Sequence, residues 1–112
     1  MGFIGDVTGV VYIYCPDTFA LRITSKMLGM PEAEIDGHEM VNDTMGEVGN
    51  MVVGKIKSRL CDRGHNCILT IPSIVRGQQF SIEPITSSTS RKVGFTSQGV
   101  PIIVEIMVKN SQ

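Results

Sequence analysis

The segment that decides the fold runs from Asp36 to Gly64 and reads DGHEMVNDTMGEVGNMVVGKIKSRLCDRG. Its apolar residues recur at intervals of three and four, which places them along one stripe of an α-helix. Polar and small residues recur at the same intervals, so the opposite side of the helix is expected to face solvent. The predicted buried stripe is Val41, Met45, Val48, Val52 and Ile56, and the predicted exposed row is Asp43, Glu47, Asn50, Gly54 and Lys57.

Both ends of this helix carry sequence signals. Asp36 and Glu39 have the spacing of a capping box, in which the first side chain accepts a hydrogen bond from the new helix and the second returns one. The helix is therefore predicted to begin at Asp36 and to end between Cys61 and Gly64.

A shorter helix is predicted before it. Asp17 or Thr18, directly after Pro16, can cap a helix that runs to about Leu28, and Gly29 is placed to end it. The residues expected on its core face are Phe19, Ile23 and Met27.

The rest of the chain has strand patterns: runs rich in β-branched residues and separated by glycine or proline. A Ser/Thr run from Thr86 to Ser90 is predicted to be a hairpin loop, since strand signals flank it. The sequence thus predicts one α+β domain over residues 1–112, an antiparallel sheet backed by two main helices. The predicted strands are Val10 to Cys15, Ile68 to Val75, Gln79 to Ile82, Lys92 to Phe95 and Val100 to Val108.

The composition bounds the class of protein. With 10 Lys and Arg against 11 Asp and Glu, there is no basic excess for nucleic acid or anionic lipid, so neither is expected as a partner. The longest apolar stretches are far shorter than the roughly 20 residues of a membrane-spanning helix. Three cysteines form no even-numbered disulfide framework, which favours a reducing compartment and a cytoplasmic protein.

Cys61, His65 and Cys67 lie close together in the sequence and could suggest a metal site. A structural zinc site usually has four ligands with paired close spacings, and no fourth ligand is evident. The chain is therefore expected to bind no metal.

The exposed row of the long helix holds one unusual combination. Glu47 and Asn50 are three residues apart and can act on one target together. Around them, Gly46, Gly49 and Gly54 stand in the helix interior, where each costs up to about 1 kcal/mol relative to alanine. Either the glycines allow another protein to approach the helix closely, or they serve packing against the sheet. The residues alone leave both explanations open.

The segment from Asn42 to Gly54, NDTMGEVGNMVVG, resembles the signature helix of the CheC/CheX/FliY chemotaxis phosphatases. In that family an Asp or Ser is followed after three residues by Glu, after two more by Asn, and later by a proline. Asp43, Glu47 and Asn50 match this motif, and Pro72, in the segment IPSIVRG, is the candidate proline. The similarity extends from about Gly5 to the C-terminus.

Two departures refine the resemblance. CheC-type members have a second Glu and Asn pair in their other helix, which the segment from Thr18 to Leu28 lacks, so the chain resembles the one-site CheX type. Members of that type also carry an additional N-terminal helix and strand, which are not evident here.

The resemblance implies an activity. The expected substrate is the aspartyl phosphate of a CheY-like receiver domain, with Asn50 orienting the attacking water and Glu47 reaching a lysine of the receiver. Magnesium is expected in the receiver, and this chain is expected to bind no cofactor. The residues expected to contact the partner are Asp43, Gly46, Gly54 and Lys57.

Two other functions fit the same sequence: a non-catalytic CheX-like module that binds a receiver or a ligand, and a flagellar switch component of the same family. The resemblance also implies a homodimer formed through the sheet. The run Val100 to Val108 agrees with this, because it has apolar residues on both faces and one layer of helices covers only one.

Overall fold

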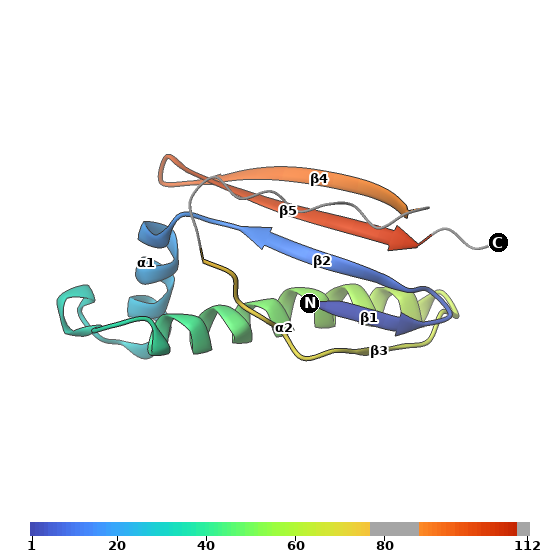
Figure 1. Cartoon of the computed structure of the whole chain (residues 1–112), viewed down its shortest axis with the longest axis horizontal. Coiled ribbons are helices and arrows are strands. Elements are labelled where there is room, and N and C mark those ends of the chain that lie inside the picture. Colours follow the sequence, from blue (N-terminus) through green and yellow to red (C-terminus); the bar gives the residue numbers. More distant parts are fainter. Residues whose placement is uncertain (77–87, 110–112) are drawn as a thin grey trace.

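The computed structural model describes residues 1–76 and 88–109, which form a five-stranded antiparallel sheet and two main helices (Figure 1). The strand order is β3-β1-β2-β5-β4. The predicted α+β class is confirmed. None of the described helices is long and apolar enough to cross a membrane. The elements are β1 (Gly2–Gly5), β2 (Gly9–Tyr14), α1 (Asp17–Leu28), η1 (Glu32–Glu34), α2 (Glu39–Asp62), β3 (Cys67–Leu69), β4 (Ser88–Ser97) and β5 (Val100–Lys109).

The first strand, β1, was not predicted because it is only four residues long. It pairs with both β2 and β3, so it joins the last turns of α2 to the rest of the sheet. A Cβ atom at Gly9 would overlap the ring of Phe3 and the carbonyl oxygen of Met107. Glycine is therefore needed where β2 passes between these two residues.

Helix α1 ends as predicted but begins differently. Gly29 adopts the left-handed conformation at φ 67° and its amide donates to the carbonyl of Ser25. The N-cap is Pro16, and neither Asp17 nor Thr18 caps the helix with its side chain, so the predicted cap is wrong. The predicted core face is also displaced, because Ala20 and Thr24 are its buried residues while Met27 is 48% exposed.

Helix α2 contains the predicted segment but not the capping box. It begins at Glu39, its N-cap is His38, and no side chain caps it. Asp36 cannot cap it because Gly37, at φ 70°, turns the chain between Asp36 and the helix. The predicted end near Cys61 is confirmed. The buried residues are Val41, Thr44, Gly49 and Val53, so Val41 is buried as predicted and the stripe lies one residue later than predicted at Gly49 and Val53.

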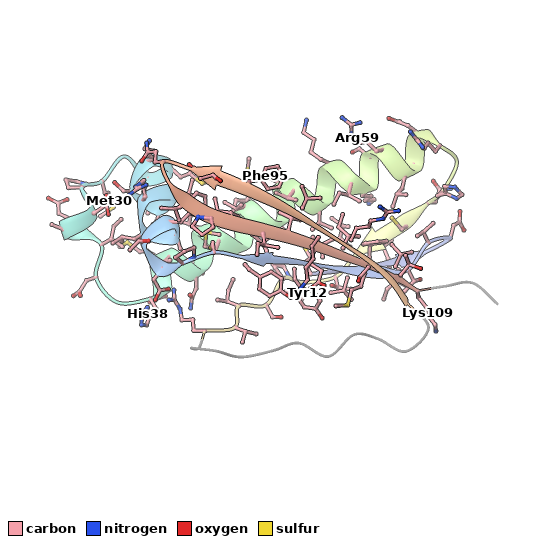
Figure 2. The ribbon with its side chains drawn as sticks, turned by 90° about the horizontal axis from the view of Figure 1, so that it is seen from above. Tyr12, Met30, His38, Arg59, Phe95 and Lys109 are labelled. Carbon is pink, nitrogen blue, oxygen red and sulfur yellow. The ribbon has the colours of Figure 1, made fainter. Side chains whose placement is uncertain are left out.

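The core lies between α2 and one face of the sheet. Its centre is formed by Phe3, Val11, Val53 and Cys67. Paired residues of an antiparallel ladder share a face, and Val11 pairs with Ile106, so alternate residues of β5 also face α2. The other face carries Tyr12, and Figure 2 shows Tyr12 and Arg59 of α2 on opposite sides of the molecule.

The strands after α2 differ from the prediction in length. Of the predicted strand Ile68 to Val75, only Ile68 and Leu69 belong to a strand, β3. The pairing with β1 ends where the amide of Thr70 donates to the carbonyl of Gly2, and the residues after Thr70 lie beyond the start of β1. The predicted strand Gln79 to Ile82 lies outside the described residues.

The predicted strand Lys92 to Phe95 is part of β4, which pairs with β5 along all ten residues. Ser88, Thr89 and Ser90 therefore belong to a strand, and their predicted place in a hairpin loop is wrong. Thr86 and Ser87 lie outside the described residues. β4 and β5 are joined by a turn at Gln98 and Gly99, where φ is 51° and 79°. Two successive positive φ angles are typical of a tight hairpin turn.

Candidate functional site

Glu47 and Asn50 project from the exposed side of α2, as predicted. One helical turn separates them, so their side chains are neighbours. Within residues 1–76 and 88–109, neither side chain makes a hydrogen bond or an ion pair. A carboxylate and a carboxamide, free in the described fold, are therefore presented together on a rigid helix. This arrangement can orient a polar group or a water molecule of another molecule.

The other residues of the predicted exposed row lie along the same helix. Asp43 is exposed one turn before Glu47, whereas Gly54 and Lys57 are half-buried on the following turns. Within the described part of the chain, Asp43 and Lys57 form no ion pair. The structure thus brings these residues onto one helix face and leaves their charged groups available.

The three glycines of α2 have different surroundings. A Cβ atom built at Gly46 would lie 3.8 Å from Cγ of Pro72, an ordinary contact distance. At Gly49, which is buried, and at Gly54, which is partly exposed, it would meet nothing within 4 Å. Packing against the sheet therefore does not explain Gly54, and the described structure contains no other reason for a glycine there.

Pro72 belongs to a segment that runs from Thr70 to Arg76 without regular structure and passes beside α2. Arg76 fixes its far end, with Nε and Nη2 donating to Oδ1 of Asn42 at 3.0 and 2.7 Å and Nη1 to Oδ1 of Asp17 at 2.8 Å. Arg76 thus joins the first turn of α1 to the first turn of α2. The sequence motif singled out Pro72 as its candidate proline, but the position of Pro72 beside α2 and the bonds of Arg76 were not predicted.

A cavity of about 420 Å³ lies between the end of β2, the start of α1 and the segment ending at Arg76. Cys15 is among its lining residues, and burial, followed by the charge of Asp17, raises the pKa of this thiol. A raised pKa keeps the thiol protonated, so Cys15 is not an activated nucleophile.

Cys61, His65 and Cys67 do not gather into one cluster. Cys67 is buried in the core, while His65 is exposed in the turn before β3. Among the residues that the structure describes, no three His, Cys, Asp or Glu side chains are close enough to hold a metal ion.

Met51 is a further residue of this surface that periodicity did not single out. Its side chain is 58% exposed, directly after Asn50 and one turn after Glu47. The position could have been recognised from the sequence, because Met51 interrupts the otherwise polar side of the helix four residues after Glu47.

Solved structures share this fold. A chemotactic CheC-like protein from Shewanella oneidensis MR-1 is 30% identical, with a TM-score of 0.81 over 96% of this chain and 70% of that chain. A CheX-CheY-BeF3-Mg²⁺ complex from Borrelia burgdorferi gives 28% identity and a TM-score of 0.82 over 97% and 73%. The fold thus places the chain in the CheC/CheX class of proteins.

The family model described as chemotaxis phosphatase CheX matches residues 1–96, so the chain belongs to the CheX family. A curated relative, the CheY-P phosphatase CheX of Thermotoga maritima, is 32% identical over 85 residues. The match covers 74% of this chain and 53% of the relative, so the chain spans about half the length of that protein.

Proposed function

We propose that this chain hydrolyses the aspartyl phosphate of a CheY-like receiver domain. The observation that carries the proposal is the pair Glu47 and Asn50, exposed one turn apart on α2 and unbonded within the described fold. Membership of the CheX family and the similarity to a protein named CheY-P phosphatase support the choice of substrate.

In the proposed reaction, Asn50 positions the attacking water. Its carbonyl oxygen accepts a hydrogen bond from the water, and its NH₂ group can donate to a phosphoryl oxygen. The water oxygen forms a bond to phosphorus, the bond from phosphorus to the aspartate oxygen breaks, and the aspartate leaves as a carboxylate while the water proton passes to the phosphate product. A neutral amide suits this role because a carboxylate would be repelled by the phosphoryl oxygens.

Glu47 has a docking role in this scheme. Its carboxylate reaches a lysine of the receiver and forms a charge-assisted hydrogen bond. One turn of helix separates Glu47 from Asn50, so this bond docks the receiver beside the amide. Glu47 thus contributes to binding, and the chemical step depends on Asn50.

The remaining surface residues provide contact area. Asp43 and Lys57 offer charges of opposite sign on either side of the pair, and Gly46 and Gly54 keep the helix surface low. The magnesium ion that assists phosphoryl transfer belongs to the acidic pocket of the receiver. This chain supplies the helix and binds no cofactor.

The proposal is tested by adding the purified protein to a phosphorylated CheY-like receiver and following the release of phosphate. Catalysis predicts that release accelerates in proportion to the protein concentration. An unchanged rate, together with co-elution of the two proteins in gel filtration, would show that the chain is a binding module and not an enzyme.

We also propose that the protein forms a homodimer through its sheet. β5 lies between β2 and β4, so it is not an edge strand. Met107, on the face of β5 away from α2, is buried within one chain. The apolar residues on both faces of β5 are therefore no longer an argument for a second copy. We place the dimer contact at the edge strand β4. Its residues Val93 and Phe95, on the α2 side of the sheet, are 49% and 54% exposed. Pairing of two β4 edges about a two-fold axis covers both residues and leaves each α2 open.

The proposed place of action is the cytoplasm. The three cysteines, Cys15, Cys61 and Cys67, are all unpaired thiols in the structure. Free thiols persist in a reducing compartment. The proposed receiver partner is a component of chemotaxis or two-component signalling.

A further inference from the structure

We propose that Met51 is an apolar docking residue, which packs against the receiver beside Asn50 on α2. The inference rests on the proposed phosphatase function and adds a residue that determines how tightly the partner docks. It begins from an exposed apolar side chain in the middle of the polar site.

Met51 lies on the opposite side of Glu47 from Asn50. At about 100° per residue, Asn50 is displaced about 60° to one side of Glu47 and Met51 about 40° to the other. Gly54, about 20° from the line of Glu47, lies between them on the next turn. Two turns of the helix therefore carry four neighbouring positions with different chemistry: the carboxylate of Glu47, the amide of Asn50, the thioether of Met51 and the open position of Gly54.

Among residues 1–76 and 88–109, Met51 has no part in the hydrophobic core. Its side chain is 58% exposed, and it is outside the buried and half-buried group that packs on Phe3, Val11, Val53 and Cys67. Beside it, a Cβ atom at Gly54 would meet nothing within 4 Å, so the helix surface next to Met51 is low. A receiver surface that packs into this low region covers the thioether.

The chemistry of methionine suits this place. A flexible, polarisable thioether adapts to an irregular partner surface and stabilises docking by burying apolar area. An apolar contact next to the phosphoryl group also excludes bulk water, which leaves the single water held by Asn50 to react. Met51 touches the receiver and not the reacting atoms, so it affects the Michaelis constant more than the turnover number.

The chain offers a matched control. Met40 is also a methionine of α2, is 40% exposed, and lies about 20° from the line of Glu47 on the same side as Met51. It is eleven residues before Met51, about 16 Å along the helix axis. A substitution at Met40 thus changes the same chemistry on the same face, but away from Glu47 and Asn50.

The test compares Met51→Gln, Met51→Leu and Met40→Gln in steady-state dephosphorylation of a receiver. Met51→Gln keeps the length and loses the apolar contact, and we expect KM to rise about tenfold while kcat stays within about twofold. Met51→Leu should restore KM, and Met40→Gln should match the wild type.

An unchanged KM in Met51→Gln, or equal rises at Met40 and Met51, would overturn the inference, and thermal melting of each variant would show whether misfolding contributes. Activity of the wild-type chain separates this result from the proposed function. A wild type without activity rejects the phosphatase proposal, whereas an active wild type with an unaffected Met51→Gln rejects only the role of Met51.

Discussion

Tyr14 on β2 donates a 2.7 Å hydrogen bond from its hydroxyl to Oε1 of Glu105 on β5. The carboxylate of Glu105 is buried, and its other oxygen lies 3.9 Å from Nζ of Lys92 on β4. This contact joins three adjacent strands on the face of the sheet opposite α2. Burial, then the hydrogen bond to Glu105 and the charge of Glu105, raise the pKa of Tyr14 to about 12.

The Tyr14 hydroxyl should make folding stability depend on alkaline pH. Its pKa is about 10 in an unfolded chain and about 12 in the fold, so its contribution is complete below pH 10 and is lost as pH rises towards 12. The difference in unfolding free energy between wild type and Tyr14→Phe should therefore shrink over that range in urea titrations. Tyr12→Phe is the control, since the Tyr12 hydroxyl has no hydrogen-bond partner among the described residues. A constant difference for Tyr14→Phe would contradict the prediction.

Asn50→Ala should remove most of the proposed phosphatase activity and leave the fold unchanged. We expect kcat to fall by about 100-fold, because the attacking water is no longer oriented. The melting temperature should change little, since Asn50 is exposed and alanine favours a helix. Single-turnover phosphate release and a thermal melt on the same sample measure both. Full turnover by the variant would remove Asn50 from the mechanism.

Glu47→Lys should weaken docking and not chemistry. The new ammonium group faces the lysine of the receiver, so KM should rise by about tenfold or more while kcat at saturation is retained. The rise in KM should be smaller at high salt, because salt screens the repulsion between the two ammonium groups. Glu34→Lys, on the exposed η1 turn, makes the same charge change away from α2 and should behave as wild type. Equal effects of the two variants would indicate a general effect of net charge.

Gly54→Ala should change stability and activity in opposite directions. The added methyl meets nothing within 4 Å, so replacing a helix-interior glycine should stabilise the fold by up to about 1 kcal/mol. The same methyl raises the surface on which the receiver packs, so KM should increase. Gly49→Ala is the control, because Gly49 also has no atom within 4 Å of the added Cβ but lies on the buried side of α2. Chemical denaturation and steady-state kinetics would be compared for both, and a gain in stability with unchanged KM at Gly54 would leave the glycine without a docking role.

The proposed dimer should depend on the exposed apolar residues of β4. Sedimentation at micromolar concentration should give twice the mass of the chain, and Phe95→Lys should shift the equilibrium to monomer because it places like charges together across the two-fold axis. Ile68→Lys, a change on the edge strand β3 at the other end of the sheet, is the control. A monomer mass for the wild type would reject this dimer.

The sequence by itself determined the two helices, the α+β class and the exposure of Glu47 and Asn50. These features depend on local periodicity, and α2 is long enough for its pattern to be unambiguous. The segment from Asn42 to Gly54 also indicated the family, but by its resemblance to the signature helix, since the residues alone left a docking surface and a packing role both open.

Only the tertiary structure decided which side of each helix faces the core. The neighbouring elements, and not the helix sequence, set that direction: α1 packs against α2, with Thr24 buried and Met27 exposed. The capping box failed for a different reason: Gly37 adopts a φ of 70° before α2, and His38, not Asp36, is the N-cap.

Contacts between residues far apart in the chain were likewise beyond the sequence. Arg76 joins Asp17 to Asn42, and Tyr14 meets Glu105 across 91 positions, and no local pattern encodes either pair. β1 is too short to show an alternating pattern, so its pairing with both β2 and β3 became visible only when the strands were assembled. Local propensity thus fixed the helix that carries the site, whereas long-range packing fixed what surrounds it.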